Sequence, residues 1–259
     1  MRPALWVLLS VLFAGCAVPS IDPTVKNELA PTGTLRVAVN YGNAVHTQRN
    51  PTGGEPLGAA PDLARELAKR VGVPVTYVTY DAAGKMAEGL KNGETDIVFL
   101  AIDPERAADI AFTRPYVLIE GTYLVRKDSP FKRVEDLDRE GVKIIVGSKS
   151  VYDLYLTREI KKATLVRGGG GVGYLEDWRK GGFDAAAGIR EVLVAEAART
   201  PSMMVVEGHF MTIPQAVGVP KARQAAARYV DQFVAEMIES GFVRRSLDKS
   251  GNTLATVPR

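Results

Sequence analysis

The chain has 259 residues, of which 46% are hydrophobic and 24% charged, which is enough for one large or two small folded domains. Its 33 basic and 30 acidic residues leave a formal net charge of +3 at pH 7, and no basic patch interleaved with aromatic residues is present, so we expect no nucleic-acid partner. Two histidines and one cysteine make no metal-binding pattern, so we expect no metal and no cofactor.

The N-terminal residues have the three parts of a bacterial export signal. Arg2 supplies the positive charge, residues 4–14 form an apolar run, and small residues precede Cys16. The run is shorter than the roughly 20 residues needed to span a bilayer. Residues 13–16, FAGC, resemble the lipobox of bacterial lipoproteins, although phenylalanine stands where that motif usually has leucine. We expect residues 1–16 to be a lipoprotein signal peptide; an ordinary signal peptide that contains a cysteine is the alternative.

Lipidation of Cys16 predicts an exported protein, periplasmic or at the cell surface, that is anchored to a membrane. Residues 17–32 contain three prolines and little periodicity, which predicts a linker between this anchor and the folded body. No later segment is apolar enough to cross a membrane.

After the predicted linker, strands alternate with helices. In the helix at 61–72, for example, leucine and valine recur every fourth residue between a proline start and a glycine stop. The patterns predict strands at 34–40, 73–80, 95–102, 141–147, 163–167, 183–188 and 202–208, a loop at 41–58, and helices at 61–72, 84–93, 150–160, 173–182, 190–199 and 221–247. Such alternation indicates two α/β units with parallel sheets, and ligands of such sheets collect at strand ends and between domains.

The order of several motifs resembles one protein family. Over residues 33–245 the segments LRVAVN, GLKNGETDIVFLAIDPERAADIAFTRPY, GVKIIVGSKS and AVGVPK are similar to family 3 periplasmic solute-binding proteins. The resemblance implies an α/β fold of the type II periplasmic binding protein class, with two lobes, two crossover strands and a ligand cleft between the lobes. Lobe one would comprise residues 33–118 and 213–259, and lobe two residues 119–212.

Arg106 is the strongest candidate for ligand binding. Asp103 suits a helix N-cap after a strand, and the first turn that follows would present unpaired N–H groups to an anion. A guanidinium adds a planar fork that fits a carboxylate; a surface arginine paired with Asp103 or Asp109 is the alternative. The resemblance implies that Arg106 binds a ligand carboxylate, although Asp103 replaces the usual threonine and Ala101 the usual hydroxyl residue.

The resemblance also predicts an acid in lobe two for a ligand ammonium group. That acid usually stands five residues after the aspartate of an Asp-Ala pair, but the fifth residue after Asp184 is Ile189. An unpaired ammonium in a closed cleft is unfavourable. Either another acid replaces it, with Glu120 the first candidate and Glu191 the nearest carboxylate, or the ligand has no ammonium group.

Further candidate ligand contacts lie in the first loop and at a predicted helix start in lobe two. They are Asn40, Tyr41, Asn43, His46, Ser148 and Lys149. Lys149 would add a second cation to the cleft, which favours a dicarboxylate or another acidic ligand over a standard zwitterion. Arg114 is predicted to be a solvated loop residue, and the glycines of residues 168–173 a flexible loop rather than a nucleotide site.

The leading hypothesis is therefore a membrane-tethered monomer that captures a small carboxylate, such as an amino acid or organic acid, and delivers it to the permease of an ABC importer. An exported enzyme similar to prephenate or arogenate dehydratases is one alternative, but Glu120, Glu191 and His46 form no convincing catalytic arrangement. A receptor that signals without import is another.

Overall fold

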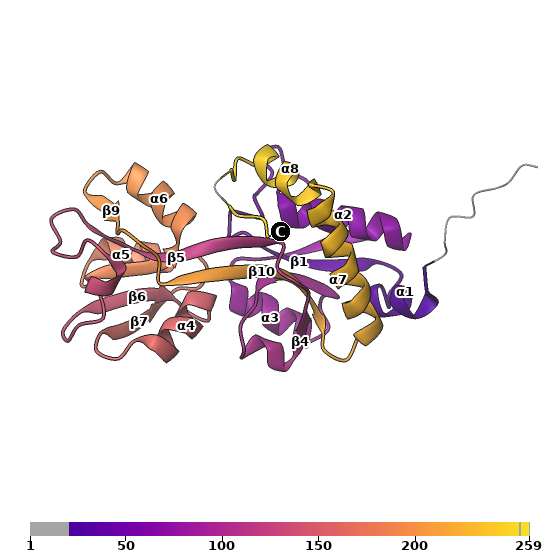
Figure 1. Ribbon diagram of the computed structural model, residues 1–259, viewed down its shortest axis with the longest axis horizontal. Helices are drawn as coiled ribbons and strands as arrows, with labels where there is room; N and C mark the ends of the chain where they lie inside the picture. Colours follow the sequence, from indigo (N-terminus) through magenta and orange to yellow (C-terminus); the bar gives the residue numbers. More distant parts are fainter. Residues whose placement is uncertain (1–20, 254, 259) are drawn as a thin grey trace, which may run out of the picture.

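The computed structural model describes residues 21–253 and 255–258 and shows two lobes that lie end to end (Figure 1). The predicted signal peptide and Cys16 lie outside the described residues. Within those residues, the helices are too short or too polar to serve as a membrane span.

Lobe one contains three parallel strands in the order β2-β1-β3, with β4 paired to a crossover strand. Every residue of β3 is buried, as expected for a parallel strand that is covered on both faces. The elements of this lobe are α1 (Pro23–Leu29), β1 (Leu35–Asn40), α2 (Ala59–Val71), β2 (Val75–Tyr80), α3 (Ala83–Lys91), β3 (Ile97–Ala101), the 3₁₀ turn η1 (Arg106–Ala108), β4 (Ile110–Phe112), α7 (Gln224–Glu239) and α8 (Phe242–Lys249).

Lobe two repeats this plan with parallel strands in the order β8-β6-β7. All five residues of β8 are buried, and the fully buried Trp178 belongs to the core of the lobe. Its elements are the 3₁₀ turn η2 (Val134–Asp136), β6 (Lys143–Gly147), α4 (Val151–Glu159), β7 (Thr164–Gly168), α5 (Tyr174–Lys180), β8 (Ala185–Ile189), α6 (Arg190–Arg199) and β9 (Met203–Val205).

Two long antiparallel strands, β5 (Val117–Arg126) and β10 (Met211–Pro220), run between the lobes (Figure 1). At one end β10 pairs with β3 and β4, and at the other β5 pairs with β8 and β9. The predicted α/β fold with two lobes and two crossover strands is thus confirmed. The lobe boundaries expected at 118/119 and 212/213 fall inside β5 and β10.

The segment predicted as a linker is partly a packed helix. In α1, Pro23 occupies the first helical position and the Asp22 carboxylate accepts the Thr24 N–H at 2.8 Å, which caps the helix. Val25 and Leu29 are buried, and α1 packs on α7. The helix has only seven residues, and two apolar residues four positions apart are too few to predict a helix from the sequence. The helix is recognised from its packing on α7.

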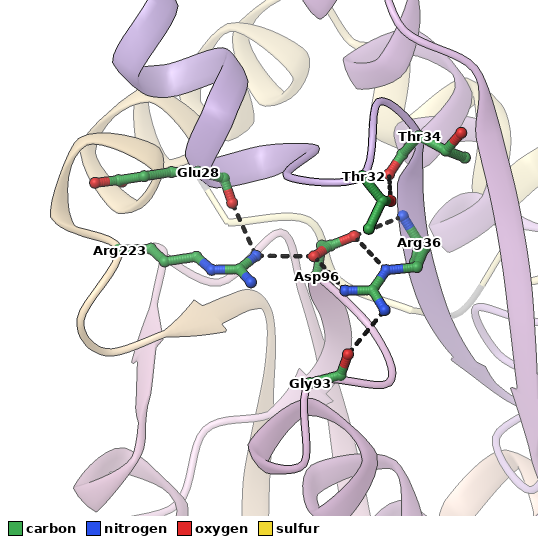
Figure 2. Close-up of polar contacts among 7 residues, drawn as sticks. All are labelled: Glu28, Thr32, Thr34, Arg36, Gly93, Asp96 and Arg223. Carbon is green, nitrogen blue, oxygen red and sulfur yellow. Dashed lines mark hydrogen bonds and ion pairs between the residues drawn. The ribbon is translucent and has the colours of Figure 1, made fainter.

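Figure 2 shows the polar network that holds α1 against the sheet of lobe one. The fully buried Asp96 accepts two hydrogen bonds of 2.9 Å from the Arg36 guanidinium. It also accepts one of 2.9 Å from Arg223, whose same Nη1 donates to the carbonyl oxygen of Glu28 at 2.8 Å. The network therefore connects the end of α1 to β1, to the start of β3 and to the residue before α7.

Other element boundaries also differ from the prediction. The helix predicted from residue 61 begins two residues earlier, at Ala59, and ends as expected at Gly72, which has a φ of +68°. The predicted C-terminal helix is two helices, because Gly241 adopts a left-handed conformation between α7 and α8.

Candidate functional site

A pocket lies between the two lobes at the ends of their strands. Its free volume is ≈ 40 Å³, which is about three times the roughly 10–15 Å³ that one ordered water needs. The lining residues come from both lobes and from a crossover strand: Asn40, Gly42, Asn43, His46, Ala83, Phe99, Leu100, Ala101, Arg106, Ser148, Ser150, Val151, Tyr152, Gly171, Ile189 and Gln215.

Arg106 is buried in this pocket, directly after β3, and is only 7% exposed. Its Nη1 donates to the carbonyl oxygen of Ala101 at 3.0 Å, and its Nη2 donates to that of Lys149 at 3.1 Å. Ala101 belongs to lobe one and Lys149 to lobe two, so the guanidinium joins the lobes. Among the described residues Arg106 forms no ion pair, and most of its N–H donors are available to a ligand.

Burial lowers the pKa of Arg106 from its usual 12.5 to about 10, although the nearby carboxylates of Asp103 and Glu105 oppose part of this decrease. Arg106 is therefore still a cation at neutral pH. A buried charge without an ionic partner is unfavourable. A bound carboxylate would supply the missing partner and would fit the planar guanidinium.

Asp103 is not the N-cap residue that the sequence predicts, because Glu105 directly precedes η1, and Asp103 does not line the pocket. Its Oδ1 accepts the N–H of Glu105 at 2.9 Å. Its Oδ2 accepts a hydrogen bond of 2.8 Å from Arg158 of α4, in the other lobe. Asp103 is 2% exposed, so this carboxylate serves the contact between lobes, and the predicted helix at this point is the three-residue turn η1.

Ser148 lines the pocket, whereas the Lys149 side chain lies outside it. The ammonium group of Lys149 is exposed and pairs with Glu88 of lobe one at 2.6 Å. The Lys149 backbone has a φ of +56°, a left-handed conformation that disfavours side chains with a Cβ. The Asp153 carboxylate accepts its N–H at 2.9 Å. Lys149 thus contributes its carbonyl oxygen to Arg106 and adds no second cation to the pocket.

Three of the four residues predicted in the first loop line the pocket. Asn40 and Asn43 are buried, and the Oδ1 atom of each accepts a nearby backbone N–H group. His46 is 1% exposed and its Nδ1 lies 2.9 Å from the Tyr116 hydroxyl. Burial lowers the pKa of His46 from 6.5 to about 4, so the ring is neutral at pH 7. Tyr41 lies outside the pocket.

Neither candidate acid for a ligand ammonium group lies in the pocket. The Glu120 carboxylate accepts from Arg190 at 2.5 Å and lies 3.2 Å from Nδ1 of His209. Burial raises the pKa of Glu191, whose Oε2 has no hydrogen-bond partner among the residues that the structure describes. Ile189 does line the pocket, at the end of β8, and is 8% exposed.

Several pocket residues are absent from the sequence-based candidates, including Phe99, Ser150, Tyr152 and Gln215. Gln215 lies on β10, where it is 2% exposed. A lone glutamine in the apolar segment IPQAVGV is a signal that could have identified it. Phe99 and Tyr152 carried no such signal, because buried aromatic residues are typical of any core.

The glycine run is packed against lobe one rather than free. Gly171 lines the pocket with a φ of +63°, and a Cβ atom there would overlap the carbonyl oxygen of Asp81. A Cβ on Gly42 would lie 3.1 Å from the Cα of Gly171. Only glycine therefore permits this approach between the lobes.

Arg114 is an exposed loop residue, as predicted, and its side chain also has a partner. Its Nη2 and its backbone N–H both donate to the Asp231 carboxylate of α7 at 2.7 Å. This pair is partly exposed and lies outside the pocket.

Comparisons with known proteins agree with this architecture. The model of the bacterial extracellular solute-binding proteins, family 3, matches residues 35–252. The L-cystine-binding protein TcyJ of Escherichia coli strain K12 is 26% identical over 96% of this chain and 94% of its own. The crystal structure of the ancestral amino acid-binding protein AncCDT-1, a precursor of cyclohexadienyl dehydratase, superposes with a TM-score of 0.72 and 25% identity over 86% of this chain and 98% of that one.

One relative is a much longer protein. The membrane-bound lytic murein transglycosylase F of Vibrio cholerae is 32% identical over 127 residues, which is 48% of this chain but only 23% of that protein. The similarity therefore covers a fraction of the transglycosylase, whereas the family match covers both lobes and both crossover strands here. The chain belongs to the bacterial extracellular solute-binding proteins of family 3.

Proposed function

We propose that this protein is a membrane-tethered receptor that captures a small carboxylate-bearing solute between its lobes and delivers it to an ABC importer. The observation that carries the proposal is Arg106, a buried cation that faces the interlobe pocket and forms no ion pair among the described residues. The cystine-binding and amino acid-binding proteins to which the chain is similar support capture of a small solute.

The pocket supports binding over catalysis. A dehydratase needs an acid or base positioned at the reacting atoms. Glu120 and Glu191 lie outside the pocket, and the His46 ring is bonded to Tyr116. The structural similarity to a dehydratase precursor concerns a protein described as amino acid-binding. Incubating the purified protein with prephenate should therefore yield no product.

Isothermal titration of the purified protein with a panel of small carboxylates tests the proposal. Each charge-assisted hydrogen bond contributes about 1.5–3 kcal/mol, and a tenfold change in affinity corresponds to about 1.4 kcal/mol. Two such bonds to a carboxylate therefore predict that Arg106→Met weakens binding by about 100-fold or more. Methionine is chosen because it keeps much of the buried volume and removes the charge.

Arg114→Met is the matched control, because Arg114 belongs to the same lobe but pairs with Asp231 outside the pocket. We expect its affinity to equal that of the wild-type protein. Unchanged affinity in Arg106→Met would show that Arg106 does not anchor the ligand. Uptake of the labelled solute by cells with and without the gene separates import from sensing: import requires that uptake falls when the protein is absent.

A further inference from the structure

The pocket has an uneven charge balance. Its lining contains one cation, Arg106, and no aspartate or glutamate among the residues that the structure describes. Two acids of the surrounding elements are engaged outside the pocket, because Asp103 accepts from Arg158 and Glu88 pairs with Lys149. A monocarboxylate would neutralise the pocket. The ammonium group of a zwitterionic amino acid would enter it without an acidic partner, which is unfavourable in a buried site.

The same balance disfavours a second carboxylate. The sequence suggests that Lys149 would bind a second ligand carboxylate, but Lys149 pairs with Glu88 outside the pocket. His46 cannot replace that cation, because its ring is buried and bonded to Tyr116. The sequence favours a dicarboxylate because it suggests that Lys149 lies in the pocket. With Lys149 outside, the second carboxylate of such a ligand would have no cation to bind.

The remaining polar lining is neutral and can donate hydrogen bonds. The Oδ1 atoms of Asn40 and Asn43 accept backbone N–H groups, which leaves the Nδ2 donors without a partner among the described residues. Gln215, a buried amide, also lines the pocket. Such groups suit a carbonyl or hydroxyl oxygen on the ligand. Ile189 adds an apolar wall at the end of β8.

We infer that the preferred ligand is a small monocarboxylate with a neutral, oxygen-bearing group in place of the ammonium group, such as a 2-oxo or 2-hydroxy acid. This inference rests on the proposed function, since it assumes that Arg106 binds the carboxylate. It departs from the amino acid ligands named for the similar proteins. Ile189, an apolar residue in the pocket wall, is the residue that selects against the ammonium group.

Matched ligand pairs test the inference on the wild-type protein, so no variant has to fold. Pyruvate is compared with L-alanine, and 2-oxoisovalerate with L-valine, by isothermal titration at pH 7. The members of each pair differ at one substituent. We expect the 2-oxo acid of at least one pair to bind at least 100-fold more tightly than its amino acid. Tighter binding of either amino acid, or of 2-oxoglutarate over both 2-oxo monocarboxylates, overturns the inference.

Ile189→Asp provides a second measurement, because it places a carboxylate in the pocket wall. This variant should gain affinity for the amino acid of each pair and lose affinity for the 2-oxo acid, whereas Arg114→Met, which lies outside the pocket, should keep the wild-type order. If amino acids bind the wild-type protein best and Arg106→Met abolishes that binding, only the present inference fails. If no carboxylate binds, the proposed function fails with it.

Discussion

Arg106 is a buried residue whose charge has no ionic partner among the residues that the structure describes. Its guanidinium is buried, and it donates to two carbonyl oxygens rather than to a carboxylate. Burial alone lowers its pKa, which means that the folded protein holds this charge at an energetic cost. Binding sites commonly retain groups that lower the stability of the free protein, because a bound ligand offsets their free-energy cost. The carboxylate that we propose as the ligand would offset this cost.

His46 predicts how stability depends on pH. Its pKa is lowered by burial to about 4, whereas an unfolded histidine takes up its proton near 6.5. Between these values the unfolded state binds more protons, so this histidine lowers stability as the pH falls through that range. The full contribution is about 3 kcal/mol, at about 1.4 kcal/mol per pKa unit. Urea unfolding at pH 7 and pH 5 should therefore show a loss of about 2 kcal/mol from His46.

His46→Gln isolates this effect, because glutamine does not titrate and can still bond to the Tyr116 hydroxyl. The variant should lose less stability between pH 7 and pH 5 than the wild-type protein does. Equal losses in the two proteins would mean that His46 takes up its proton in the folded state as readily as in the unfolded one.

At the scale of elements, α1 changes how the folded body meets its N-terminal segment. The helix buries Val25 and Leu29 on lobe one and is held by the network around Asp96 (Figure 2). Figure 1 places α1 at the end of lobe one that lies away from lobe two. If Cys16 carries a lipid, as the sequence predicts, only the few residues between it and Pro23 remain as a tether.

Leu29→Ala tests whether α1 belongs to the core. Leu29 is fully buried, and replacing a buried leucine with alanine costs about 2–5 kcal/mol. We expect chemical denaturation to show a loss in this range. Asn27→Ala is the control on the same helix, since Asn27 is exposed and such changes stay within about 0.5 kcal/mol. If the two variants are equally stable, residues 23–29 behave as an unpacked linker and not as a helix of the core.

At the scale of the whole molecule, the lobes are closed on each other. Contacts cross the cleft at the Asp103–Arg158 and Glu88–Lys149 ion pairs, at the bond from Arg106 to the Lys149 carbonyl, and where Gly171 meets Asp81. Within residues 21–253 and 255–258, β5 and β10 are the strands that run continuously between the lobes. The closed state therefore depends on a small set of polar contacts and on the ligand, in agreement with hinge closure around a bound solute.

Arg158→Ala should shift the ligand-free protein toward an open arrangement. The variant leaves the buried Asp103 carboxylate without its partner, and opening returns that carboxylate to water. We expect a larger radius of gyration in small-angle X-ray scattering and ligand affinity weakened several-fold, because part of the binding free energy must then close the lobes. Arg114→Ala, whose pair with Asp231 lies within lobe one, should change neither quantity. If Arg158→Ala has the wild-type radius of gyration and ligand affinity, the Asp103–Arg158 ion pair does not stabilise the closed arrangement.

The sequence predicted much of the fold and the centre of the site. Hydrophobic periodicity located most helices and strands, because an element that buries one face has apolar residues at regular intervals in its sequence. The motif order predicted the two lobes, and the position of Arg106 after a buried strand pointed to the pocket. Asn40, Asn43, His46 and Ser148 also line it as expected. All of these follow from short-range signals.

Only the tertiary structure decided which candidates face the pocket and which face each other. Asp103, Lys149 and Glu120 are polar residues at suitable positions in the chain, but each pairs with a residue at least 55 positions away. Gln215 reaches the pocket because a crossover strand returns from lobe two. By itself the sequence determined the alternation of strands and helices and the position of an arginine just after a buried strand; the placement of the Asp103, Lys149 and Glu120 side chains outside the pocket is a long-range property that no local pattern encodes.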